Sequence, residues 1–188
     1  DDKKPDHARV GEAVYRTAKE LQGYISKLEE IRVPVIAAVH GGVIGGALDL
    51  ITACDMRFAS NDAFFCIQEI NIGMAADVGT LQRLPKIIPD SKMREMAYTG
   101  RRMLADEAKD SGLVGEIYET QDEMLDAVHK LAAEIASKSP VAIYGLKAVM
   151  NYSRDHNVSD SLDFNALWSG AMLSQADMTE AMTAQMEK

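Results

Sequence analysis

Hydrophobic and polar positions group into blocks along the chain, and these blocks predict helices and strands. Residues 8–31 carry most of their apolar side chains at spacings of three and four, which predicts an amphipathic helix. Pro34 ends helical geometry, and residues 33–39 form an apolar, β-branched run without polar alternation. Such a run is typical of a strand buried on both faces of a parallel sheet. The first part of the chain therefore predicts a helix followed by a buried strand.

Strands and helices continue to alternate along the rest of the chain. The predicted strands are residues 56–60, 63–68 and 114–118, and residues 40–46 and 69–78 are predicted loops. The predicted helices are residues 47–54, 80–84, 91–98 with Ser91 as N-cap, 104–112, 121–137, 140–152 and 161–188. This alternation indicates an α/β fold. The last helical stretch is rich in methionine, which is typical of a core or a subunit interface.

The composition narrows the class of protein. A length of 188 residues predicts one domain, or one domain with an appendage. The net charge is −9 and no run of Lys and Arg occurs, so we expect no nucleic-acid partner. The longest apolar run, residues 33–39, is far too short to span a bilayer, so we expect no membrane insertion. Cys54 and Cys66 each lie in an apolar run, which predicts reduced, buried thiols.

A cluster of glycines follows the first predicted strand. Gly41, Gly42, Gly45 and Gly46 occupy four of six positions between that strand and a helix. A tight turn with positive φ explains a single glycine, but several together also let a ligand approach backbone N–H groups closely. The spacing matches neither a dinucleotide fingerprint nor a P-loop. We therefore expect an oxyanion site, where an enolate or a tetrahedral intermediate collects negative charge.

Three carboxylates stand where apolar or small residues are the default. Asp49 falls in the first turn of the helix after the glycines, where it either complements the helix dipole or faces the same cavity. Glu69 and Asp77 lie in the loop after the strand at residues 63–68. Either acid alone is typical of a solvated loop. Together in apolar surroundings they predict a coupled pair that takes a proton from one carbon and delivers one to another.

Other catalytic classes lack their residues. His40 follows a strand, but no second His or Cys stands at metal-ligand spacing, so we expect a structural role for it and no metal site. No Gly-x-Ser-x-Gly elbow is present to indicate a serine hydrolase. The glycine turn and the carboxylates thus remain the candidate chemistry.

Five stretches resemble the crotonase superfamily of enoyl-CoA hydratases and isomerases. They are PVIAAVHGGVIGGALDL, ACDMRFAS, DAFFCIQEINIGMAADVGTLQRLPK, ADEAKDSGLVGEIYE and SKSPVAIYGLKAVMNYSRDHNVSDSLD. The resemblance covers nearly the whole chain. The stretch from Glu69 to Pro85 is similar in particular to the Δ3,5-Δ2,4-dienoyl-CoA isomerase subgroup. The glycine turn alone marks only the superfamily.

The resemblance implies a crotonase-like spiral of ββα units whose N-terminal part is absent from this chain. Residues 1–138 are then a partial spiral core that carries the active site, and residues 139–188 are a C-terminal helical trimerisation region. The family forms homotrimers that pair into hexamers, which suits the Met-rich end of the chain.

The resemblance also implies roles for individual residues. Gly46 corresponds to the second oxyanion-hole N–H, and the neighbouring substrate-binding glycines are Gly41, Gly42 and Gly45. Asp77 would remove a proton from C2 of a 3,5-dienoyl thioester and Glu69 would protonate C6, with Asp49 as a third pocket acid. Typical hydratases lack an acid at the Asp77 position. The expected partner is an acyl-CoA thioester; coenzyme A is part of this substrate, and no cofactor is expected.

Two departures from the family pattern affect this expectation. Ala47 stands where the family has a third glycine, a change that helix geometry tolerates. The family's first oxyanion N–H falls upstream of residue 1, so we expect a fragment of a longer protein. Loss of one such donor costs on the order of 100–1,000-fold in rate, which predicts low activity for these residues alone.

Three alternatives remain open from the sequence. Two are enzymes of the same family, an enoyl-CoA hydratase and a Δ3-Δ2-enoyl-CoA isomerase. The third is a non-catalytic binding protein of the same fold. The family implies a mitochondrial or peroxisomal location, in the β-oxidation of unsaturated fatty acids. The chain ends at residues 185–188 without a Ser-Lys-Leu peroxisomal address.

Overall fold

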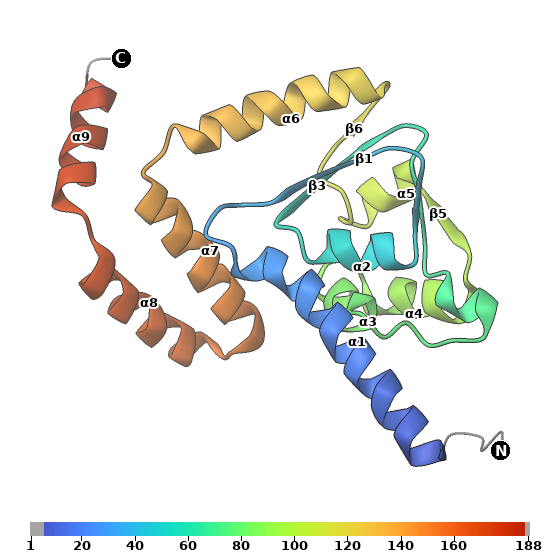
Figure 1. The fold of residues 1–188 in the computed structure, drawn as a ribbon. Helices are drawn as coiled ribbons and strands as arrows, with labels where there is room; N and C mark the ends of the chain where they lie inside the picture. The colour runs from blue at the N-terminus through green and yellow to red at the C-terminus, as the bar shows by residue number, and fades with distance from the viewer. Residues whose placement is uncertain (1–5, 187–188) are drawn as a thin grey trace. The chain divides into compact units, whose positions relative to one another are not determined.

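The computed structural model describes residues 6–186, which divide into two compact units. The first unit contains residues 6–29 and 36–124, and the second contains residues 30–35 and 125–186 (Figure 1). The predicted division between residues 138 and 139 concerns the roles of the two parts and stays a prediction.

The first unit alternates short strands with helices. Its strands are β1 (Ile36–Val39), β2 (Gly42–Ile44), β3 (Met56–Ser60), β4 (Phe64–Cys66), β5 (Arg102–Leu104) and β6 (Ile117–Tyr118). Its helices are α1 (His7–Glu30), α2 (Gly46–Thr52), α3 (Thr80–Arg83), α4 (Asp90–Thr99) and α5 (Ala105–Asp110), with two 3-10 helices, η1 (Glu69–Ile72) and η2 (Leu84–Lys86). The predicted α/β character is confirmed.

The strands form two three-stranded sheets. In the first sheet β3 lies between β1 and β6 and is parallel to both, with Ile36 opposite Met56. In the second, β4 lies between β2, which is parallel to it, and β5, which is antiparallel. Phe65 at the centre of β4 faces Val43 and Met103, and all three side chains are buried. These apolar pairs fix the register of the sheet that leads into the candidate site.

Short elements account for the differences from the predicted structure. The predicted loop at residues 40–46 contains β2, the loop at residues 69–78 contains η1, and β5 precedes α5. Strands of three residues carry almost no periodic signal, because their pairing with β4 is set by distant parts of the chain. Ser91 was also wrong as an N-cap: it lies inside α4, whose capping position is Pro89. Gly100 ends this helix with φ +60°, as predicted.

The second unit is helical. Its helices are α6 (Gln121–Ala136), α7 (Pro140–Asp155), α8 (Val158–Met172) and α9 (Gln175–Met186). The predicted helical stretch at residues 161–188 is therefore two helices, and residues 187–188 lie outside the described part. Side chains cap the N-termini of α7 and α8. Ser139 accepts the backbone N–H of Ala142, and Asn157 accepts that of Asp160.

Aromatic contacts join α7 to α8. The rings of Tyr144 and Trp168 meet edge to face with centroids 4.9 Å apart, and Tyr152 stacks on Phe164 at 4.3 Å. Lys147 on α7 is buried and donates to the carbonyl oxygen of Val33, at 3.0 Å. Within residues 6–186 the structure has no helix long and apolar enough to cross a membrane.

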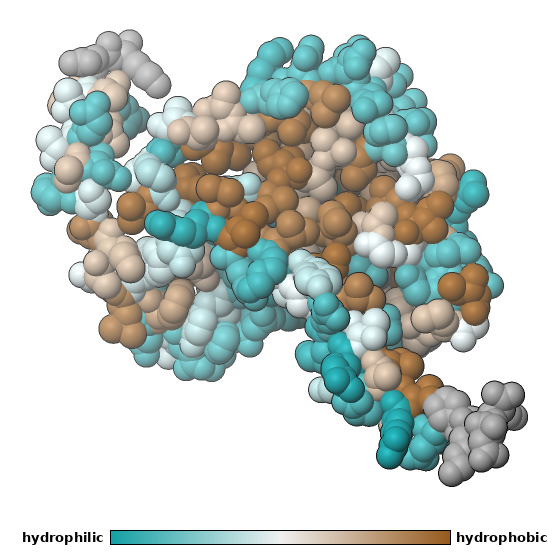
Figure 2. Space-filling view, viewed as in Figure 1, coloured by the Kyte–Doolittle hydropathy of each residue, from teal (hydrophilic) through white to brown (hydrophobic). Residues whose placement is uncertain are grey.

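Several apolar side chains of α8 and α9 reach the surface of the second unit. More than half of the surface of each of these side chains is exposed: Val158, Leu162, Leu167, Met182 and Met186. Figure 2 shows apolar atoms at the surface of α8. A further apolar groove of about 450 Å³ lies among α7, α8 and α9 and is lined by Trp168, Met172 and Met178 among others. These side chains do not form a closed core within the described chain.

Candidate active site

The glycine turn brings Glu69 close to the start of α2. Gly45 precedes α2 with φ +55° and ψ −119°, a conformation that L side chains rarely adopt, and its N–H donates to the Cys66 carbonyl of β4 at 3.0 Å. A methyl carbon built on Gly45 would lie 2.9 Å from Oε1 of Glu69. The backbone conformation of Gly45 therefore favours glycine, and a side chain at this position would displace the carboxylate that lies against it.

Glu69 is half-buried and opens the 3-10 helix η1, directly after β4. The parallel pairing of β2 with β4 places the end of β4 beside the turn that follows β2. Sequence reasoning predicted that an acid and the glycine turn share one site, and for Glu69 and Gly45 the structure brings the two together.

Asp49 is the most deeply buried of the three predicted acids. It lies in the first turn of α2 and its residue is 1% exposed. Its Oδ1 accepts the backbone N–H of Thr80, the first residue of α3, at 2.6 Å. This charge-assisted bond joins the start of α3 to α2. Asp49 therefore has a structural partner, and its role in catalysis stays a prediction.

Asp77 is exposed, in the segment between η1 and α3. The preceding residue, Ala76, is buried, and the carbonyl oxygen of Asp77 accepts a hydrogen bond from Nε2 of Gln22 on α1 at 2.7 Å. The backbone at Asp77 is thus fixed to the unit while its side chain is open to solvent. An apolar cavity shared by Glu69 and Asp77 stays a prediction.

The other predicted glycines have distinct surroundings. Gly41 has φ +62° and its carbonyl accepts the N–H of Phe64 at 2.9 Å. A methyl carbon on Gly42 would lie 2.9 Å from the ring of Phe64, so strand packing accounts for that glycine. Gly46 begins α2 and has no atom within 4 Å of a built methyl carbon. The space beside Gly46 can therefore admit another group.

A second set of contacts holds η1, the helix that begins at Glu69. The side-chain amide of Asn71 donates to the carbonyl oxygen of Gly100 at 2.9 Å and to Gln68 at 3.2 Å. Sγ of the buried Cys66 also approaches the Gly100 oxygen, at 3.2 Å, and burial raises the pKa of this thiol. The C-terminus of α4 therefore anchors the helix that carries Glu69. The prediction of free, buried cysteines is confirmed.

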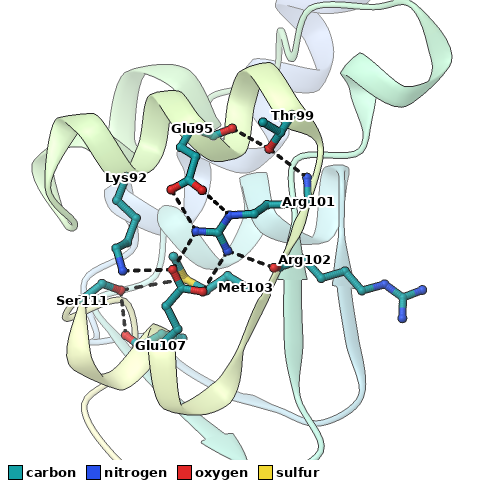
Figure 3. Close-up of polar contacts among 9 residues, drawn as sticks. Lys92, Glu95, Thr99, Arg101, Arg102, Met103, Glu107 and Ser111 are labelled. Carbon is teal, nitrogen blue, oxygen red and sulfur yellow. Dashed lines mark hydrogen bonds and ion pairs between the residues drawn. The ribbon is translucent and has the colours of Figure 1, made fainter.

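Arg101 forms a charged cluster directly after Gly100 (Figure 3). Its guanidinium donates to both carboxylate oxygens of Glu95 and of Glu107, and to the carbonyl of Arg102. Lys92 donates to Glu107 at 3.0 Å. Hydrogen bonds from Arg101 hold the pKa of Glu107 at about 2, well below its usual range. This cluster ties α4 to α5 on either side of β5.

We expect the Glu107 cluster to make folding stability depend on acid. Because the pKa of Glu107 is about 2 when folded and about 4.5 otherwise, its contribution is complete above pH 4.5 and is lost as the pH falls towards 2. The contribution is on the order of 1–3 kcal/mol, since the group is partly screened by solvent. Thermal melts at pH 7 and pH 3 should therefore differ less in Glu107→Gln than in the wild type.

Glu12→Gln is the matched control for this acid dependence. The pair between Glu12 and Arg16 lies on exposed helix surface, where an ion pair contributes little. The variant should keep the wild-type difference between the two pH values. An unchanged pH difference in Glu107→Gln would contradict the assignment.

Sequence reasoning missed the residues that hold the predicted acids. Gln22 contacts the backbone of Asp77, and Asn71 holds the helix that begins at Glu69. Arg83 binds Ser26 of α1 and lies against the backbone of Gly79. Gln22 and Asn71 stand among residues typical of a solvated helix face or loop, so their residue types gave no signal. Within residues 6–186 no group of three His, Cys, Asp or Glu side chains is placed to hold a metal ion.

The sequence and the fold of the chain both match a known protein family. The family model for enoyl-CoA hydratase/isomerase matches residues 7–188, and the chain belongs to that family. A probable enoyl-CoA hydratase/isomerase from Mycobacterium abscessus has a crystal structure that superimposes with a TM-score of 0.87 at 31% identity, over 94% of this chain and 69% of that one. The crotonase-like fold is thereby confirmed.

Within the family the chain is similar to dienoyl-CoA isomerases. It is 50% identical over 186 residues to the mitochondrial Δ(3,5)-Δ(2,4)-dienoyl-CoA isomerase of Rattus norvegicus, covering 95% of this chain and 57% of the relative. It is 46% identical over 183 residues to the peroxisomal enzyme of Arabidopsis thaliana, covering 97% of this chain and 66% of the relative. The chain thus spans somewhat more than half the length of these relatives.

Proposed function

We propose that the protein is an enzyme that converts 3,5-dienoyl-CoA to 2,4-dienoyl-CoA. The observation that carries the proposal is the placement of Glu69 against Gly45, on the glycine turn, in a chain 50% identical to a dienoyl-CoA isomerase. The second acid, Asp77, follows on the same segment eight residues later. An acid at each end of this segment suits a reaction that removes a proton at one carbon and adds one at another.

The proposed steps balance protons and electrons. The carboxylate of Asp77 takes a proton from C2, and the electron pair of that C–H bond spreads into the diene and onto the thioester oxygen. The N–H of Gly46 donates to this oxygen while it carries the negative charge. Glu69 then gives a proton to C6, leaving double bonds at C2 and C4. The two acids return to their starting states by proton exchange with solvent.

Asp49 has two functions in this proposal. It binds the N–H of Thr80 and so fixes the start of α3, three residues after Asp77. As a buried carboxylate on α2, in the helix that also begins with Gly46, it is the proposed third acid of the substrate pocket. Gly41, Gly42 and Gly45 complete the proposed substrate-binding turn. The residues need no metal or redox cofactor, since every step moves a proton.

A spectrophotometric assay tests the proposal. Turnover of 3,5-dienoyl-CoA by the purified protein should produce the strong ultraviolet absorbance of a conjugated 2,4-dienoyl thioester. Bleaching of a 2-enoyl-CoA chromophore instead would identify an enoyl-CoA hydratase, and conversion of a 3-enoyl-CoA alone would identify a Δ3-Δ2-enoyl-CoA isomerase. Binding of these thioesters without turnover would identify a non-catalytic member of the fold.

We further propose that the core is a spiral of ββα units and that residues 139–188 form an oligomerisation region. The exposed apolar side chains of α8 and the groove lined by Trp168 support an interface in this region. The proposed assembly is a homotrimer that pairs into a hexamer, and light scattering of the purified protein tests it. A monomeric mass at working concentrations would exclude the assembly.

The proposed compartment is the mitochondrion or the peroxisome. The support is that the similar isomerase of Rattus norvegicus is mitochondrial and that of Arabidopsis thaliana is peroxisomal. The proposed partner is an acyl-CoA thioester, with no nucleic acid and no membrane insertion. Fractionation of cells that make the protein distinguishes the two compartments.

A further inference from the structure

One face of α1 carries a row of polar residues that contact the segment containing Asp77. Gln22, Ser26 and Glu29 are spaced by four and three residues, so they lie on the same side of the helix. Gln22 Nε2 donates to the carbonyl oxygen of Asp77 at 2.7 Å. Nη2 of Arg83, at the end of α3, donates to Ser26 Oγ at 2.9 Å and to Glu29 Oε2 at 2.8 Å. The row therefore binds both ends of the segment from Asp77 to Arg83.

The contacts around Arg83 are sheltered from solvent. The side chains of Arg83 and Glu29 are 14% and 15% exposed, although α1 has no residue that is fully buried. In Figure 1 α1 runs beside α3, as these bonds require. A partly buried ion pair with good geometry is costly to break from one side, because the remaining charge loses its partner. This ion pair is a specific attachment of α1 to the segment.

The middle of the segment is also held. Gly79 has φ +139°, and a methyl carbon built on it would lie only 1.9 Å from Nη1 of Arg83, so the guanidinium lies directly over the Gly79 backbone. The next residue, Thr80, donates its N–H to the buried Asp49 at 2.6 Å. Gly73 and Gly79, the glycines on either side of Asp77, both have positive φ. A backbone with such permissive positions needs outside contacts to keep one conformation.

We propose that Gln22 and Arg83 are positioning residues for Asp77. The inference rests on the proposed function, in which Asp77 is the base that removes the C2 proton. Gln22 fixes the backbone from which the exposed carboxylate projects, and Arg83 fixes the turn that follows it. A displacement of about 1 Å in a reacting group can cost on the order of 100-fold in rate. Loss of the Gln22 bond therefore acts on proton removal more than on substrate binding.

Gln22→Met tests the proposal because methionine has nearly the same length and no N–H to donate. We expect kcat for 3,5-dienoyl-CoA to fall by on the order of 10-fold with KM changed less than about twofold. The kinetic isotope effect with substrate deuterated at C2 should rise, because proton removal becomes more rate-limiting. Gln22→Lys keeps a donor at this position and should recover part of kcat.

Two variants of the same helix are controls. Lys19→Met removes the ammonium group that donates to the side-chain oxygen of Gln22, and Tyr24→Phe removes a hydroxyl that donates to Glu20. Both should keep the wild-type kcat and isotope effect. If Gln22→Met lowers the melting temperature, both proteins are assayed at a temperature where they are folded. The isotope effect is a ratio of two rates of the same preparation, so a smaller folded fraction does not change it.

The outcomes separate this inference from the proposed function. A wild-type protein that does not isomerise 3,5-dienoyl-CoA removes the proposed function and the positioning role with it. An active wild type, together with a Gln22→Met protein of unchanged kcat and unchanged isotope effect, overturns the positioning role alone. An increased isotope effect that Gln22→Lys reverses supports it.

Discussion

Replacing Asp77 by Asn, or Glu69 by Gln, is expected to lower turnover of 3,5-dienoyl-CoA by about 100-fold to 10,000-fold. Each variant keeps the shape of the side chain and removes its ability to exchange a proton. A loss of this size is the usual contribution of general acid–base catalysis. Stability should change little, because Asp77 is exposed and Glu69 is half-buried. Steady-state kinetics with the absorbance assay and thermal melts of the same preparations measure both effects.

The two variants should differ in one partial reaction. Asp77→Asn should abolish exchange of the C2 proton with solvent, since the proposed base is lost. Glu69→Gln should retain that exchange while it blocks protonation at C6. Asp62→Asn, a change at an exposed acid that bonds to Ser60, is the control and should leave turnover unchanged. Full turnover in either site variant would remove the proposed mechanism.

Gly45→Ala is expected to reduce both stability and turnover. An L residue is strained at φ +55° and ψ −119°, which costs on the order of 1–3 kcal/mol of folding free energy. The added methyl group would also lie 2.9 Å from Oε1 of Glu69 and displace the proposed C6 acid. We expect turnover to fall by at least about 10-fold, as for other small displacements of reacting groups. Chemical denaturation and the absorbance assay measure the two effects.

A neighbouring glycine and a double variant control for this result. Gly46 begins a helix, and a methyl group added there would meet no atom within 4 Å. The free energy of unfolding of Gly46→Ala should therefore equal or exceed that of the wild type. In a Glu69→Gln background, Gly45→Ala should reduce turnover little further, because both changes act on the same group. Additive losses of turnover would show that Gly45 acts independently of Glu69.

The sequence predicted the longer elements of the fold correctly. The apolar run at residues 33–39 contains β1, and the amphipathic pattern of residues 8–31 corresponds to α1. Hydrophobic periodicity identifies such elements because the pattern persists over several helical turns or along a whole strand. The strands β2 and β5 were not predicted, since three residues that pair with β4 carry too little periodicity to show it.

The candidate site was predictable in its residue types and less so in its support. A glycine turn and the acid at residue 69 were predicted to share one site from their residue types and apolar neighbours, and the pairing of β2 with β4 brings them together. The contacts of Gln22 and Arg83 join positions 54 to 57 residues apart, and nothing in local sequence signals such pairs. Asp49 was predicted as an acid of the pocket, and its bond to Thr80 became evident only from the fold.

Proton labelling tests most directly the claim that two acids on one segment transfer protons at different carbons. The protein is incubated with 3,5-dienoyl-CoA in D₂O and the product is analysed by NMR. Two separate acids predict a 2,4-dienoyl thioester with deuterium at C6, since Glu69 draws its proton from solvent. A product that carries the original C2 hydrogen at C6, or one hydrated at C3, would contradict the two-acid isomerase.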